Sequence, residues 1–469
     1  MDGPAALRRT DDERPPRWWS RRAAAALRSR EGSFEYSRLV APALFVAGLF
    51  AYWLIYHLQL PYGPPVRSDG EGYYAYLPAY LIYGDPSLAS VVREHFLPTY
   101  AHTGFTPSDF GLTLQSTGSW LDKYEIGEAL LLVPIFLIGH VIALVHDGAA
   151  ATGYTHPEVY AVGTGGLVYA VLGILALRAV LRRWFSDGVT AATLVVIILG
   201  TGLFHYATYD SIFSHAFAFG AVSVTLLCAL RWFERPDSWW RAAGFGLAAG
   251  TVVVVRIPDL VILPGVLLLG VGSVAALRAR VRLLARDHAA RSALALGCSA
   301  VPMVPQVLTW WVATGYLIVQ PYVGESFHFA HPHLLAALFS FYPHGLFPYA
   351  PSLLLAVIGV GIAWWRRREM ALPVTVAFLP FWYVMSSWWD WSFSDGFGDR
   401  IFVDILPLLA LPLAVFFASL RPGWLRRGAA ALTGVLVLVT ISLMVAYWRG
   451  ALGGAGAPVG EYLRLVIHP

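Results

Sequence analysis

Apolar runs of about 20 residues recur along this chain, and a run of that length crosses the hydrocarbon core of a bilayer as a helix. Short loops with clustered arginines separate the runs. Charged residues make up 13% of the chain, whereas soluble domains carry about 25%. These features predict an all-α polytopic membrane protein of about 11–13 transmembrane helices. They do not indicate a nucleic-acid partner.

The arginines also predict which way the chain is oriented, because basic residues in short loops mark the cytoplasmic side. Residues 1–38 are rich in arginine and are expected to form a cytoplasmic tail. Residues 39–447 form the predicted transmembrane domain, and its first external loop comprises residues 59–125. Residues 448–469 are expected to be an external tail. The chain is therefore predicted to be a multi-pass protein of the cell (plasma or inner) membrane.

The apolar run 126–146 does not fit a simple alternation of sides. If it crossed the membrane, all later arginine clusters would lie outside. The loop that follows it, HDGAAATGYTHPE, contains no Lys or Arg. We expect the run to enter the membrane without a net crossing, bending near Pro134, since irregular backbone is tolerated where protein shelters it. The alternative is a second crossing between residues 72 and 125.

Cysteine and histidine spacing does not predict a metal site. Cys228 and Cys298 both fall in apolar runs, and neither a disulfide framework nor a zinc site follows from them. His328, His331 and His333 crowd one predicted loop, but their spacing matches no strong zinc pattern.

Ionisable residues gather in the predicted external segments. A single acid in such a loop can simply be solvated. Arg256 and Asp259 differ because they interrupt an apolar run, where charge is expensive and is usually functional or paired. They could form a mutual ion pair or belong to a site. His215 lies one turn into a predicted span and could be a structural histidine or a ligand-binding one.

Two further features carry alternatives. Trp388, Trp389 and Trp391 could be an interfacial aromatic belt, or a wall for a sugar ring, whose apolar face packs on aromatic side chains. Lys123 is the one lysine among 33 basic residues. An ammonium differs from a guanidinium in hydration and geometry, so this position could require it.

Five segments, taken in order, resemble blocks of a known superfamily. They are SDGEGYYAYLPAYLIYGD, WLDKYEIGEALLLVPIF, YATYDSIFSHAF, GESFHFAHPHLLAALFSFYPHGLFPYAP and WWDWSFSDGFGDR. Over about residues 40–420 the chain resembles the GT-C glycosyltransferases, which depend on polyprenyl-phosphate sugars. It is distantly similar to bacterial relatives of protein mannosyltransferases and to lipid A aminoarabinose transferases of the cell envelope. The resemblance implies a GT-C-like bundle whose large first external loop contains short helices.

The resemblance implies a hexosyl or pentosyl transferase that acts at the external face. It would move a sugar from a polyprenyl-phosphate donor to a hydroxyl of a glycan, lipid or protein acceptor, with inversion. Asp69 matches the position of the family's catalytic acid. Glu71 competes with it because this chain has Asp-Gly-Glu instead of an adjacent acidic pair. No cofactor is certain, and a divalent metal such as Mg²⁺ or Mn²⁺ is left open.

The remaining candidate residues follow from the same resemblance and from their chemistry. Fixed cations should stabilise a leaving phosphate, and the candidates are Lys123, Arg256 and Arg400. Substrate contacts are expected from Tyr73, Tyr74, Tyr76, Tyr124, Asp210, His215, Glu325, Trp389 and Asp390. A transporter or flippase of lipid-linked sugars, and a non-catalytic protein of envelope assembly, are the alternative functions. Charge concentrated at one membrane face favours the enzyme.

Overall fold

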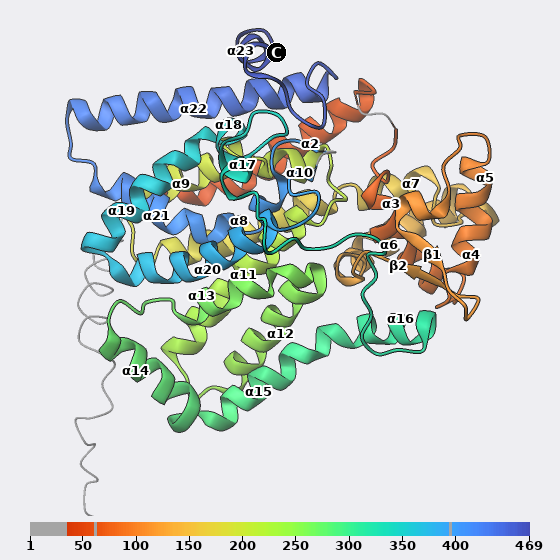
Figure 1. Ribbon diagram of the computed structural model, residues 1–469, viewed down its shortest axis with the longest axis horizontal. Helices are drawn as coiled ribbons and strands as arrows, with labels where there is room; N and C mark the ends of the chain where they lie inside the picture. The colour runs from red at the N-terminus through yellow and green to blue at the C-terminus, as the bar shows by residue number, and fades with distance from the viewer. Residues whose placement is uncertain (1–34, 61–62, 394–395) are drawn as a thin grey trace, which may run out of the picture.

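The computed structural model describes residues 35–60, 63–393 and 396–469, and it is built almost entirely of helices. Within these residues, seven helical segments are long and apolar enough to cross a membrane, and five shorter apolar helices accompany them. In Figure 1, α8, α20, α21 and α22 run roughly parallel, and the elements between α3 and α7 gather at one end of this bundle.

The helices can be grouped by length. The long segments are α2 (Ser37–His57), α6 (Gly127–His146), α7 with α8 (His156–Val162, Gly165–Leu181), α11 (His215–Glu234), α15 with α16 (Ala289–Ala300, Val304–Thr314), α20 (Arg368–Ser386) and α22 (Trp424–Trp448). The shorter apolar helices are α9 (Asp187–Leu199), α12 (Trp239–Val255), η5 with α13 (Ile257–Ile262, Leu263–Leu267), α19 (Leu354–Arg366) and α21 (Leu406–Ser419). Short connecting helices are α10 (Leu203–Thr208), α14 (Val274–Arg282), α17 (Leu334–Phe339), α18 (Leu346–Tyr349), η9 (Arg400–Val403) and α23 (Val459–Ile467).

The predicted loop 59–125 contains the short helices that the sequence led us to expect, and a hairpin that it did not. The helices are α3 (Asp69–Leu81), α4 (Ala89–Val91) and α5 (Leu97–Tyr100). Strands β1 (Leu112–Leu114) and β2 (Trp120–Asp122) pair antiparallel, with Leu112 opposite Asp122. The hairpin delivers Lys123 and Tyr124, which follow β2 directly, to the end of the bundle.

The largest apolar core lies among α8, α9, α11 and α21. Its helices approach closely where glycines allow it. A Cβ at Gly359 of α19 would collide with the backbone of Pro412 in α21, and one at Gly173 of α8 would collide with Phe219 of α11. Such close packing holds neighbouring helices in fixed positions. Because α11 and α21 are held in this core, the residues at and just before their first turns are also held in place. Several site residues lie there.

The C-terminal segment 448–469 folds back onto the bundle. Tyr462 and Leu465 of α23 are buried, and the Tyr462 hydroxyl donates to the carbonyl of Pro348 at 2.5 Å. In Figure 1 this helix lies beside the end of α22. The segment predicted as a tail is thus packed. Residues 1–34 of the predicted N-terminal tail lie outside the described residues.

Most of the run 126–146 forms α6, a single helix that includes Pro134, and a bend there stays a prediction. At its start, the backbone N–H of Ile126 donates to Gln306 Oε1 at 2.7 Å. Beyond its end, the Tyr74 hydroxyl of α3 donates to the carbonyl of Gly153. The chain thus enters α6 just after the hairpin, and the loop that follows α6 contacts α3. That the run makes no net crossing stays a prediction.

Cysteine labelling would test this topology. In a background with Cys228→Ala and Cys298→Ala, Ala150→Cys and Ala330→Cys should react with an impermeant reagent from outside. Val281→Cys should react only after permeabilisation. All three positions are exposed, so reactivity reports sidedness rather than burial. Protection of Ala150→Cys in intact cells would show that α6 crosses.

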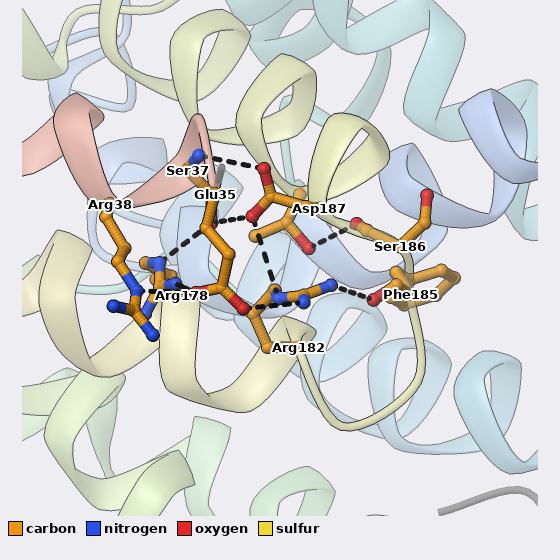
Figure 2. Close-up of polar contacts among 9 residues, drawn as sticks. Glu35, Ser37, Arg38, Arg178, Arg182, Phe185, Ser186 and Asp187 are labelled. Atoms are coloured by element: carbon orange, nitrogen blue, oxygen red, sulfur yellow. Dashed lines mark hydrogen bonds and ion pairs between the residues drawn. The ribbon is translucent and has the colours of Figure 1, made fainter. Parts of the chain in front are cut away.

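A polar network joins the start of α2 to the turn between α8 and α9 (Figure 2). Arg178 and Arg182 pair with Glu35 at 2.6 and 3.1 Å. Ser37 donates through both its backbone N–H and its hydroxyl to the carboxylate of Asp187. The network satisfies the first turn of α2 and ties this helix to its neighbours.

The network predicts a pH-dependent stability. Burial would raise the pKa of Glu35, but hydrogen bonds and charges from Arg38 and Arg182 outweigh burial and lower its pKa from 4.5 to about 2. The stabilisation is therefore complete above pH 4.5 and is lost as the pH falls towards 2. Glu35→Gln should lower Tm by a few degrees at pH 7, and the difference from wild type should shrink below pH 4. A Tm difference independent of pH would contradict this role.

Candidate active site

A cavity of about 460 Å³ lies between the first-loop elements and the ends of several spanning helices. Its wall is drawn from α3, the residues after β2, the start of α11, η5, the segment 318–327, the segment 388–393 and η9. Most of the candidate residues line it: Asp69, Tyr73, Lys123, Tyr124, His215, Arg256, Glu325, Trp389, Asp390 and Arg400. Side chains far apart in sequence therefore meet in one space.

Asp69 is held in this cavity from two sides. The Tyr124 hydroxyl donates to its Oδ1 at 2.8 Å, and Arg400 Nη2 lies 2.9 Å from its Oδ2. The two glycines that follow it in α3 are needed for close approach. A Cβ at Gly70 would collide with Ile212, and one at Gly72 would collide with the Tyr124 ring. The Asp-Gly-Glu-Gly sequence thus lets the start of α3 press against its neighbours.

Glu71 points elsewhere. It is buried, and its Oε1 accepts a hydrogen bond from the Tyr100 hydroxyl at 2.9 Å. Its Oε2 lies 3.3 Å from Nε2 of His95, whose ring stacks on Tyr154. Glu71 does not line the cavity. Each residue along a helix turns by about 100°. Asp69 and Glu71 are two residues apart, so their side chains leave α3 on nearly opposite sides.

Three other candidates also lie outside the cavity. Tyr74 is engaged with Gly153, and the Tyr76 hydroxyl donates to the carbonyl of Tyr124 at 2.8 Å. Asp210 pairs with Arg67 Nη2 at 2.6 Å and with Nε2 of His205 at 2.8 Å. It lines a separate cavity of about 380 Å³. Of these side chains, that of Tyr76 contacts a residue of the cavity wall, Tyr124.

The electrostatics around Asp69 favour a charged guanidinium and a protonated phenol. Burial would lower the pKa of Arg400, but Asp69 and the neighbouring tyrosines together outweigh burial and raise that pKa above its usual value. Burial raises the pKa of Tyr124 well above its usual range, and the charge of Asp69 adds to this. Arg400 therefore stays a cation, and Tyr124 stays a hydrogen-bond donor to the carboxylate.

Lys123 lies in the wall of the cavity and is ion-paired. Its Nζ is 3.0 Å from Oε1 of Glu325, and the indole N–H of Trp389 donates to the other carboxylate oxygen at 3.2 Å. The ammonium also lies 5.7 Å from the centre of the Tyr322 ring. The lone lysine is thus part of a polar cluster rather than a solvated loop residue.

Arg256 forms its ion pair with Asp404 at 2.9 Å, so the mutual pair of Arg256 and Asp259 considered from the sequence is wrong. Oδ1 of Asp404 also lies 3.0 Å from Nδ1 of His215, within hydrogen-bonding distance. Asp404 is fully buried and lies behind the cavity wall. Desolvation makes an isolated carboxylate in such a place costly, and the guanidinium offsets that cost.

Several residues of the site were not predicted from the sequence. Tyr322, Phe213, Ser214 and Phe393 line the cavity. They carry no charge, so only their position in space distinguishes them from other apolar or small residues. Asp404 could have been found, because it is an acid within an otherwise apolar run, the signal that singled out Arg256.

The tryptophans divide between two environments. Trp388 and Trp389 line the cavity, whereas Trp391 stacks on the ring of His333 with centroids 5.6 Å apart. Within the residues that the structure describes, no group of three or more His, Cys, Asp or Glu side chains is arranged to hold a metal ion. The acid at position 395 lies outside the described residues.

Comparison with known proteins supports the architecture. No family model matches the chain, and no curated protein matches it in sequence. A crystal structure of ArnT from Cupriavidus metallidurans bound to undecaprenyl phosphate matches with a TM-score of 0.51 at 15% identity. The match covers 91% of this chain and 76% of that one. At this identity it shows the fold alone. The chain therefore has the GT-C-like membrane fold that its motifs predicted.

Proposed function

We propose that this protein is a glycosyltransferase that moves a sugar from a polyprenyl-phosphate donor to an acceptor hydroxyl at the external face of the membrane. One observation carries the proposal. Asp69 shares a cavity with three cationic side chains, Lys123, Arg256 and Arg400. A carboxylate can take a proton from the acceptor, and cations can stabilise a leaving phosphate. The undecaprenyl phosphate in the ArnT structure supports a lipid phosphate as the ligand class.

The chemistry assigns a role to each group. Asp69 accepts the proton of the acceptor hydroxyl as that oxygen attacks the anomeric carbon of the sugar. The bond between the anomeric carbon and the phosphate oxygen breaks, and the phosphate departs with the electron pair. The charge that develops on the phosphate is met by the fixed cations. A single displacement of this kind inverts the anomeric configuration.

The rest of the wall suits the other parts of the donor. Trp388, Trp389 and Tyr322 line the cavity, and aromatic faces pack against the apolar face of a sugar ring. Ile318 and Val319 supply an apolar part of the wall for the first units of a polyprenyl chain. Polar and apolar surfaces are thus both available to an amphipathic donor.

The test is a panel of undecaprenyl-phosphate sugars offered to the purified full-length protein in lipid nanodiscs. The expected result is that one donor is consumed with stoichiometric release of undecaprenyl phosphate when a hydroxyl acceptor is present. Movement of the same lipid between leaflets without release would indicate a transporter instead. Failure to bind undecaprenyl phosphate or any of the sugars would overturn the proposal.

A further inference from the structure

A buried carboxylate behind the cavity holds two of its lining residues at once. Asp404 has an exposed fraction of 0%. It lies between η9 and the start of α21. Its Oδ2 is ion-paired with Nε of Arg256 at 2.9 Å, and its Oδ1 lies 3.0 Å from Nδ1 of His215. Arg256 follows α12, and His215 begins α11. One acid therefore couples three segments of the chain at one point of the wall.

We infer that Asp404 is a positioning residue, which orients Arg256 and His215 towards the junction of sugar and phosphate in the donor. This inference rests on the function proposed above. Asp404 does not touch the cavity itself, whereas Arg256 and His215 both line it. Apart from the field of its charge, Asp404 can therefore act on the substrate only through these two side chains.

The guanidinium of Arg256 has two polar neighbours, one beside Nε and one beside Nη1. Asp404 engages its Nε, and its Nη1 donates to the Ser214 hydroxyl at 3.3 Å. A guanidinium is a planar fork, and its recognition of phosphate depends on the direction in which that plane faces. The ion pair and the single hydrogen bond together restrict the orientation of this plane before the donor arrives. The ordering cost on binding is thereby reduced.

The same acid selects the form of His215. A carboxylate accepts hydrogen bonds, so Nδ1 carries the proton and Nε2 offers a lone pair. A phosphodiester carries no proton at neutral pH and cannot donate to that lone pair. Nε2 therefore requires an O–H or N–H group beside the phosphate. In a glycosyl phosphate the substituent on C2 is adjacent to the anomeric carbon, so a hydroxyl or acylamino group there is the expected partner.

Binding of undecaprenyl phosphate tests the first part of the inference. Asp404→Asn keeps the shape of the side chain but removes its charge. We expect the affinity for undecaprenyl phosphate to fall about tenfold. Residues that orient metal-binding side chains have effects of this size at the lower end of their range, and Asp404 would orient Arg256 in a similar way. A purely electrostatic role predicts the opposite sign, because removing a negative charge beside Arg256 should tighten anion binding. Affinity that is unchanged or tighter overturns the inference.

A double variant shows whether the effect passes through Arg256. Added to Arg256→Gln, the Asp404→Asn change should alter affinity by less than about twofold, since residues that act as one unit are non-additive. The double variant removes both buried charges and therefore leaves neither one unpaired. If Asp404→Asn alone does not fold, the affinity of the double variant is compared with that of Arg256→Gln. A further loss as large as in the wild-type background would contradict the mechanism.

His215 is tested with two probes. The assay is run at about pH 8, above the second phosphate pKa of about 6, so that undecaprenyl phosphate carries no proton to donate. His215→Phe should then leave the affinity for undecaprenyl phosphate unchanged and weaken undecaprenyl-phosphate glucose by about 2- to 12-fold, the value of one hydrogen bond. Asp404→Asn should weaken both ligands. Weaker binding of sugar-free undecaprenyl phosphate to His215→Phe would contradict this division of roles.

Glu158→Gln is the matched control. Glu158 is also fully buried and pairs with a histidine, His140, at 2.5 Å, but it lies outside the cavity. It should lower stability without changing affinity for undecaprenyl phosphate. Absence of binding by the wild type would defeat the proposed function. Binding that Asp404→Asn leaves intact would defeat only this inference.

Discussion

Asp69→Asn should lower kcat by roughly 10²- to 10⁴-fold, the range that a general base contributes. Asparagine keeps the shape of the side chain and can still accept from Tyr124 through its one oxygen, but it loses the ion pair with Arg400. It cannot take up the proton of the acceptor hydroxyl at neutral pH. Donor affinity should not fall, because the base acts on the acceptor and loss of its charge leaves Arg400 freer to meet the donor phosphate. Sugar transfer and donor binding should be measured on the same preparation.

Glu71→Gln is the matched control for this experiment. It removes a carboxylate two positions away that is buried against Tyr100 and His95. We expect a loss of stability with kcat close to that of the wild type. If Glu71→Gln loses activity while Asp69→Asn keeps it, Glu71 is the base. If both keep activity with a verified donor, neither acid is the base and the mechanism fails.

Lys123→Ala should raise donor KM or lower kcat/KM by about 10- to 150-fold, because loss of a hydrogen bond to a charged group costs roughly 1.5–3 kcal/mol. The ammonium lies in the cavity wall, 3.0 Å from Glu325. Its removal would also leave Glu325 with only Trp389 as a partner among the described contacts. The measurement is the donor dependence of sugar transfer, together with the affinity for undecaprenyl phosphate.

Two variants separate the effects of Lys123. Lys123→Arg keeps the charge, so partial activity would show that charge suffices, and a full loss would show that the compact ammonium is required. Glu325→Gln removes the partner while leaving the ammonium free for phosphate. Near-wild-type turnover of Lys123→Ala would show that Lys123 serves only its ion pair with Glu325.

The sequence predicted the membrane class because that class depends on local chemistry, and most of the residues that it proposed for a site line one cavity. Apolar runs of about 20 residues have few alternatives to a membrane span. A charge inside such a run is conspicuous, and this signal indicated Arg256, whereas Asp69 and Arg400 became candidates through the resemblance to the GT-C glycosyltransferases. The hairpin of β1 and β2 was missed because two strands of three residues each leave too short a pattern to detect.

The sequence alone predicts a helical membrane protein in which acids, cations and aromatic residues are concentrated in a few segments. Only the tertiary structure separated Asp69 from Glu71, since they differ by helical direction rather than by chemistry. It also paired Arg256 with Asp404 instead of Asp259. The two partners lie far apart along the chain, and no local pattern specifies their pairing. Ion pairs form between neighbours in space, and the packing of α11, α12 and α21 decides which residues those are.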